Sequence, residues 1–307
     1  MLRVTNNMKS NQLLLNLNRN ARQMQNTQEQ MSTGMKINRP SDDPVGMTYS
    51  LRYRADVAAN QQYQKNVDSS ISWLEYNDTT LTQTNDVLQK LRELTVQAAT
   101  GTNPQSALDS INSEISQLKE QFIDIANSQL NGKYIFNGQN YDQKPYEFST
   151  GADGTHDITN GANVQTDTGT INYMIGDNVK LPLNVTGNQV FGTSTETDNI
   201  FNLLNNVSAA LKNGDVGELS KQLANIDTRV EKVLTAQSEV GAKTNRVELM
   251  QSRLGDMEVN LTALQSKVED SNYAELLVKS QIQENIYTAS LSAGAKIIST
   301  SLVDFLR

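Results

Sequence analysis

The sequence contains no cysteine and a single histidine, His156. Disulfides, thiol chemistry and Cys-ligated zinc are therefore excluded. One imidazole cannot build a His-rich metal site, and imidazole catalysis needs positioned neighbours. The chain also lacks a P-loop, a GxSxG motif, an HExxH motif and an EF-hand loop. We therefore predict a non-enzymatic protein without a cofactor or a metal site.

Apolar residues are scarce, and acidic residues outnumber basic ones. The apolar share of the 307 residues is 37%, against roughly 45–50% in ordinary globular chains. Gln, Asn, Ser and Thr make up the difference, which predicts narrow apolar seams rather than one thick core. The net charge of −8 argues against nucleic acid or an anionic membrane as the main partner.

Long hydrophobic runs are missing as well. No stretch approaches the roughly 20 apolar residues of a membrane span. The run Leu13–Leu15 is too short for the core of a secretory signal, and polar residues follow it. The sequence thus predicts a cytoplasmic protein, or one exported by a route whose signal is not a hydrophobic peptide.

Helical periodicity marks both ends of the chain. Apolar positions there recur at alternating steps of three and four residues. The N-terminal seam comprises Leu14, Leu17, Ala21, Met24, Gln28, Met31 and Met35, and the C-terminal face comprises Val278, Ile282, Ile286, Ala289, Ala293 and Ile297. Such seams bury little area per turn, so these helices are expected to need neighbours. We expect an isolated monomer with mobile ends at about residues 1–40 and 272–307.

The segment GMKINRPSDDPVG interrupts the first helix, for which Thr5 is a candidate cap. Ser41, Asp42 or Asp43 can cap a second helix that starts at Pro44, where the missing N–H costs nothing. A metal-binding pair of Asp42 and Asp43 is the weaker alternative, because two adjacent carboxylates without a third ligand make a poor site.

Stronger seams lie in the inner parts of the chain. One long helix is predicted from about residue 45 to 100 and another from residue 104 onward. In the C-terminal half, fifteen positions from Leu219 to Val268 follow a strict three-four alternation, which is typical of a coiled coil or bundle. Arg229 and Lys243 occupy two of them. They can set register by pairing with acids on another helix, but partial exposure of the seam there is the preferred interpretation.

The composition changes near Gly132. Nine of the 17 glycines lie between Gly132 and Gly192, and turn residues separate short β-type runs. These runs are 133–136, 146–148, 170–175, 179–185 and 189–191. His156 falls in this region and is expected to be a solvated surface residue.

The predicted fold class is mainly α: an elongated antiparallel helical bundle or coiled coil formed by the N- and C-terminal halves, with a small β-rich inserted domain. The predicted divisions are 1–40 with 272–307 for the terminal helices, 41–131 with 198–271 for a central helical bundle, and 132–197 for the insert. The antiparallel arrangement brings both termini to the same end.

Motifs at both ends of the chain resemble one family. The N-terminal ones are RVTNNM, NLNRN, MSTGMKINRPSDDPVG, YRADVAANQQYQKN and WLEYNDTTL, and the C-terminal ones are KTNRVELMQSRL, NLTALQSKVEDSNYAE and GAKIISTSLVDFLR. Together they resemble the third hook-associated proteins of the flagellin superfamily, which form hook–filament junctions. Flagellins tend to read KDDAAG where this chain has SDDPVG, and they usually end in a different tail. Ser299, Thr300 and Ser301 depart from a Pro-Ser pair found in many relatives.

The resemblance implies a structural adaptor of the bacterial flagellum that is exported by the type III system and is extracellular after export. It implies partners: the first hook-associated protein on the hook side, flagellin on the filament side, other copies of the chain in a ring, and an export chaperone on the C-terminal helix. Two alternatives remain, namely a filament-forming flagellin and a binding or enzymatic module carried by the insert.

The same resemblance divides the seams into two sets. We expect the inner layer of the polymer to contain Leu14, Leu17, Met24, Met31, Met35, Ile282, Ile286, Ile297, Leu302, Phe305 and Leu306. We expect the bundle core to contain Leu74, Leu81, Leu88, Leu108, Ile111, Ile115, Leu118, Phe122, Val247, Met250, Leu254, Met257, Leu261 and Leu264. Whether the three methionines bind a partner or pack in the polymer is left open, since both uses need the same face.

Overall fold

The computed structural model describes residues 6–150 and 156–303. The chain divides into two compact units, one made of residues 1–60 and 256–307 and the other of residues 61–255. Helix dominates the described residues, and the strands form only two small sheets. The predicted fold class, mainly α with a small β part, is confirmed. The predicted insert, 132–197, lies wholly in the second unit.

The first unit contains α1 (Asn6–Thr33), the start of α2 (Pro44–Ala98), the end of α6 (Val216–Glu269) and α7 (Tyr273–Val303). Of the three candidate caps of α2, the structure selects Asp43, because its carboxylate accepts hydrogen bonds from the backbone N–H groups of Val45 and Gly46 at 3.1 and 2.9 Å. Asp42 instead accepts from Asn38 and Arg39 and holds the preceding loop. Thr5, the predicted cap of α1, lies outside the described residues.

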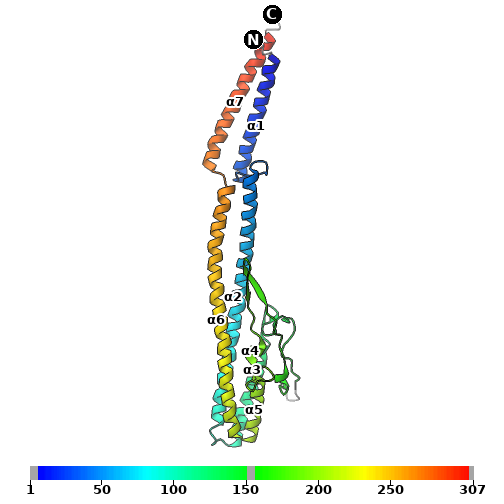
Figure 1. Ribbon diagram of the computed structural model, residues 1–307, viewed down its shortest axis with the longest axis vertical. Helices are drawn as coiled ribbons and strands as arrows, with labels where there is room; N and C mark the ends of the chain where they lie inside the picture. The colour runs from blue at the N-terminus through cyan, green and yellow to red at the C-terminus, as the bar shows by residue number, and fades with distance from the viewer. Residues whose placement is uncertain (1–5, 151–155, 304–307) are drawn as a thin grey trace. The chain divides into compact units, whose positions relative to one another are not determined.

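The second unit packs the rest of α2 and α6 with α3 (Gln105–Ala126) and α5 (Ile200–Asn213). Side-chain contacts define the direction of α2 against α6: Arg92 meets Asp227, Thr82 meets Gln237, and Asp68 meets Gln251. Residue numbers rise on one helix as they fall on the other, so the pair is antiparallel (Figure 1). Asn199 caps α5, and Gly214 ends it in a left-handed conformation with φ +66°.

The insert contains fewer strands than the sequence predicts. One antiparallel pair joins β1 (Gln129–Leu130), which lies just before the insert, to β2 (Lys133–Tyr134), and a second joins β3 (Asn172–Gly176) to β4 (Val179–Pro182). A short 3-10 turn covers Gly161–Asn163. The remaining backbone is mostly irregular and lies along the helices of the second unit (Figure 1).

Two predicted strands of the insert are wrong. Residues 189–191 belong to the short helix α4 (Gly187–Phe191), because Thr186 and Gln189 form a reciprocal capping box. Residues 146–148 form no strand, and their aromatic rings pack in the core of this unit. Tyr146 lies 5.3 Å from Phe191 and 5.1 Å from Phe201, measured between ring centroids, and all three are buried.

No helix among the described residues has both the length and the apolar character needed to cross a membrane.

Candidate functional site

The pairing of α1 with α7 creates the first candidate surface. Leu13 lies against Gly294, Asn20 donates to Ser290 at 3.4 Å, and Met35 bridges to Asp270. The order of these contacts makes the pair antiparallel, and the two helices lie side by side in Figure 1. On α7 the less exposed positions recur every three or four residues, as expected for a helix seam. These positions are Leu276, Ser280, Gln283, Tyr287, Ser290 and Gly294.

This inward seam of α7 is not the face that the sequence suggests. The large apolar residues predicted to form its packing face point away from α1 and are exposed. We call Val278, Ile282, Ile286, Ala289 and Ala293 the outer stripe; its Val and Ile members are 47–62% exposed. Small and polar residues take the inward seam, so the monomer leaves the apolar stripe without cover.

The matching seam on α1 is shifted by one residue at its N-terminal end. Leu13 is half-buried and Leu14 is exposed, whereas the sequence places Leu14 inward. Leu13 rather than Leu14 faces α7 because Gly294 leaves room for it: a Cβ at Gly294 would lie only 2.8 Å from Cδ2 of Leu13. Thr27 is buried in the seam, and the predicted Gln28 is exposed.

The other residues expected in the inner layer divide into two groups. Leu17, Met24, Met31 and Met35 are half-buried. Ile297 and Leu302 belong to α7, but their side chains are outside the described part, as are Phe305 and Leu306 altogether.

Most of the residues expected in the bundle core are enclosed. Those that are buried are Leu74, Leu81, Leu88, Leu108, Ile111, Ile115, Phe122, Val247, Leu254 and Leu261, while Leu118 and Met250 are half-buried against them. Met257 and Leu264 are exposed, contrary to the heptad pattern. Both belong to the first unit, where α6 contacts the start of α2, and a pair of helices encloses a narrower strip than a bundle does.

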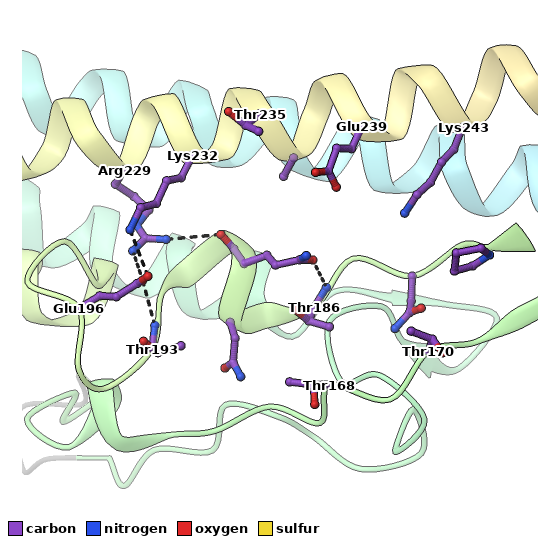
Figure 2. Close-up of a pocket in the computed structure, with 15 residues that line it drawn as sticks. Thr168, Thr170, Thr186, Thr193, Glu196, Arg229, Lys232, Thr235, Glu239 and Lys243 are labelled. Carbon is purple, nitrogen blue, oxygen red and sulfur yellow. Dashed lines mark hydrogen bonds and ion pairs between the residues drawn. The ribbon is translucent and has the colours of Figure 1, made fainter.

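The second candidate is a polar pocket of about 730 Å³ in the second unit, between α6 and the insert (Figure 2). Lys232, Thr235, Glu239 and Lys243 line it from α6. Hydroxyl and amide groups line it from the insert, at Thr168, Thr170, Asn184, Thr186, Asn188, Gln189 and Thr193. Lys243, expected in the α6 seam, is half-buried at this wall.

Arg229 lies at one end of the pocket. The sequence-based prediction that Arg229 is partly exposed is wrong. Its side chain has no exposed surface and lies 2.7 Å from the Glu196 carboxylate and 2.9 Å from that of Asp198. Lys232 contacts the same two carboxylates at 3.1 and 2.9 Å. The acids come from the loop before α5, not from another helix, and that loop covers the seam (Figure 2).

Backbone geometry and charge both fit this cluster. Gly192 has φ +95°, and a Cβ there would lie 2.5 Å from the Arg229 guanidinium, so the loop can reach α6 only with glycine. Burial alone would raise the pKa of Glu196, but hydrogen bonds from Arg229 and Lys232 lower it to about 2. The four charges cancel, which makes the cluster a structural tie between insert and helix rather than an obvious ligand site.

His156 is not the solvated residue that the sequence suggests. Its Nδ1 lies 2.5 Å from Glu120, its backbone N–H donates to the same carboxylate, and its carbonyl accepts from Lys119 at 2.6 Å. Burial alone would raise the pKa of Glu120, but the hydrogen bonds from His156 lower it overall. These contacts bind the insert to α3. The hydroxyl side chains among the residues that line the adjoining pocket are those of Ser116 and Ser208.

Those hydroxyls are already used: Ser116 donates to a backbone carbonyl, and Ser208 donates to Asn112. Within residues 6–150 and 156–303, no three His, Asp or Glu side chains are grouped in a way that could hold a metal ion. The acids that matter most here, Glu196, Asp198 and Glu269, were not singled out from the sequence. Their cationic partners lie 31 to 215 residues away, so no local motif marks these ion pairs.

Comparison with known proteins shows what the chain resembles. The family described as the bacterial flagellin N-terminal helical region matches residues 4–141. Flagellin of Escherichia coli O127:H6 is 34% identical over 148 residues, which are 48% of this chain and only 25% of that flagellin. Flagellar hook-associated protein 3 of Salmonella typhimurium is 27% identical over 236 residues, covering 72% of this chain and 74% of that protein.

A solved structure agrees with these matches. Bacillus cereus FlgL superposes with a TM-score of 0.56 at 25% identity, covering 70% of this chain and 99% of that one. The predicted resemblance is confirmed from both directions, sequence and fold. The chain is thus similar to proteins of the flagellin superfamily, with a flagellar hook-associated protein and flagellins among its relatives.

Proposed function

We propose that this chain is the structural adaptor that joins hook to filament in the bacterial flagellum. Hook-associated protein 3 is among its relatives, and FlgL is among the solved structures that it resembles. In this proposal the chain is exported unfolded by the type III system. It assembles outside the cell in a ring beside the first hook-associated protein and presents a surface on which flagellin polymerises.

The outer stripe is the observation that carries the proposal. A row of exposed Val and Ile side chains does not stabilise a monomer. Fuller burial of each one would contribute about 1 kcal/mol of favourable free energy, which is available only if something covers the stripe. The partner helix α1 does not cover them. Neighbouring subunits in a polymer would, and the stripe therefore serves as the assembly surface of the inner layer.

The weak inward seam fits the same proposal. Serine, glutamine and glycine at the α1–α7 contact give the pair little apolar burial. Because stability there is low, the helices can be unfolded for passage through an export channel and become ordered when neighbours cover the stripe. The same stripe is available to an export chaperone before assembly, so chaperone and polymer would compete for it.

A filament-forming flagellin is the second candidate, since flagellins are also among the relatives. Cells that lack this chain separate the two. If the chain is the adaptor, these cells keep hooks, synthesise flagellin and release it to the medium without attached filaments. Filaments that persist on the hooks of such cells would contradict the adaptor function. If these cells contain no flagellin on a denaturing gel, the chain is itself the filament subunit.

A further inference from the structure

Two connections of the first unit, far apart in sequence, are joined to each other. The loop 34–43 links α1 to α2, and residues 270–272 link α6 to α7. Ser271 N–H donates to the carbonyl of Gly34 at 3.0 Å, and Lys36 N–H donates to the carbonyl of Glu269 at 2.6 Å. With the bridge between Met35 and Asp270, these bonds make a short antiparallel ladder where α1 ends and α7 begins.

The side chain of Glu269, at the end of α6, connects this ladder to α2. Its side chain is 3% exposed, and its carboxylate accepts two hydrogen bonds from Arg54, at 2.6 and 2.9 Å. Ser50 donates to it as well, and Gln265 donates at 3.1 Å. One residue thus ties α6 to the first turns of α2 through its side chain and to the loop before α2 through its backbone. These hydrogen bonds, led by those from Arg54, lower the pKa of Glu269 to about 2, so the carboxylate is charged.

The α1–α7 contact offers few large apolar side chains to specify its register. Only Leu276 and Tyr287 are large among the inward positions of α7, and the others are small or polar. A slip by one heptad would bring Ser280 to the place of Tyr287 and Gln283 to that of Ser290. Tyr287 would then take the place of Gly294 beside Leu13, so this single close contact is what opposes the slip within the pair. The polar contact between Asn20 and Ser290 is long, at 3.4 Å, and cannot enforce the register alone.

We propose that Glu269 is the register-setting anchor of the α1–α7 pair. By fixing the end of α1 against the beginning of α7, it selects one of several similar alignments of the two helices. A pair slipped by one heptad would shift the outer stripe along the axis relative to α1. The inference concerns the chain alone and does not depend on the proposed role in the flagellum.

The absence of cysteine allows a direct test by engineered crosslinks. Asn20→Cys with Ser290→Cys reports the observed register. Asn20→Cys with Gln283→Cys reports a slip of seven residues, since about 10 Å of axial offset prevents that disulfide in the observed register. Both pairs are oxidised with copper phenanthroline in the full-length chain, in three backgrounds: otherwise unchanged, Glu269→Ala, and Glu275→Ala as an exposed acidic control at the start of α7.

The unchanged and Glu275→Ala backgrounds should form the first crosslink at least about tenfold faster than the second. In Glu269→Ala that ratio should fall towards one as the second crosslink appears. An unchanged ratio would overturn the proposal. Loss of both crosslinks at unchanged helix content would also overturn it, because Glu269 would then hold the helices together rather than select their register.

A second variant guards against a folding defect. Arg54→Met removes the main partner of Glu269 and keeps a side chain of similar length at a half-exposed position. Helix content by circular dichroism identifies the variants that remain folded. The ratio must fall in Arg54→Met as well, and a ratio equal to that of the unchanged chain contradicts the anchor.

Discussion

The guanidinium of Arg229 lies 2.9 Å from the carboxylate of Asp198, and only 6% of the Asp198 side chain is exposed. The two residues are 31 positions apart in the sequence: Arg229 is on α6, and Asp198 is in the loop before α5. Glu196 and Lys232 complete a neutral cluster at 2.7–3.1 Å. The contact between insert and helix therefore depends on paired buried charges, and it weakens greatly if one of them is left alone.

Truncation of Arg229 should destabilise the second unit strongly. We expect Arg229→Ala to lower its free energy of unfolding by about 3–5 kcal/mol, because a fully buried side chain is removed and the enclosed Asp198 loses its buried partner. The half-exposed Lys232 is the matched control, and Lys232→Ala should cost about 1 kcal/mol or less. Trp73, the single tryptophan, is buried in this unit, so its fluorescence in urea measures both variants. Equal losses for the two variants would contradict the assigned roles.

Acid should destabilise the same unit in a defined window. The folded pKa of Glu196 is about 2 against an ordinary 4.5, so its contribution is complete above pH 4.5 and is lost as the pH falls towards 2. The full difference corresponds to about 3 kcal/mol, which we reduce to about 1–2 kcal/mol because a third of the side chain is exposed. In the variant Glu196→Gln, the free energy of unfolding, measured by Trp73 fluorescence, should depend less on pH between about pH 5 and about pH 2. A variant as steep as the parent would exclude Glu196 as the source.

Charge placed in the outer stripe should prevent assembly without unfolding the chain. Ile282→Asp combined with Ile286→Asp should abolish filament attachment in cells, because a carboxylate buried among apolar neighbours costs several kcal/mol. Circular dichroism of the purified double variant should show little change, since both positions are exposed in the monomer. Thr288→Asp, exposed on another side of α7, is the control and should leave attachment intact. Normal attachment in the double variant would remove the stripe from the assembly surface.

Backbone amides of α1 and α7 should exchange rapidly in a dilute solution of the isolated chain. Their contact buries few large apolar side chains, whereas α3 and α5 enclose Leu108, Phe122, Phe201 and Leu204 in the core. Hydrogen exchange followed by mass spectrometry should therefore show protection in α3 and α5 and much less in α1 and α7. Strong protection of α1 and α7 in the monomer would mean that neighbours are not needed for their stability.

Removal of polar groups from the pocket tests whether the insert carries a separate activity. Deleting residues 139–197 would also remove Tyr146 and Phe191 from the aromatic core, so point changes are cleaner. Glu239→Gln with Lys243→Ala changes two side chains at the pocket wall that belong to neither the charge cluster nor the core. Motility and filament attachment should be unchanged. Loss of either, with normal stability, would favour a binding function of this pocket.

The sequence alone determined the order of the elements and many of their ends. Helix, short β segments and helix follow from periodicity and composition, and Asp43 before Pro44 marks the start of α2 as predicted. The uninterrupted inner seams were also informative, since most of their members are buried. These features are local, so a single stretch of sequence contains the information that specifies them.

Tertiary structure decided which faces are used. A stripe of Val and Ile on α7 says that a face is apolar, but not whether it meets α1 or another molecule, and the small residues Ser290 and Gly294 took the inward side. Likewise, the partners of Arg229 and Glu269 lie tens or hundreds of residues away in the sequence. The loop before α5 buries Arg229, which the sequence predicts to be partly exposed. Contacts between distant segments depend on how the whole chain packs, and helical periodicity does not encode them.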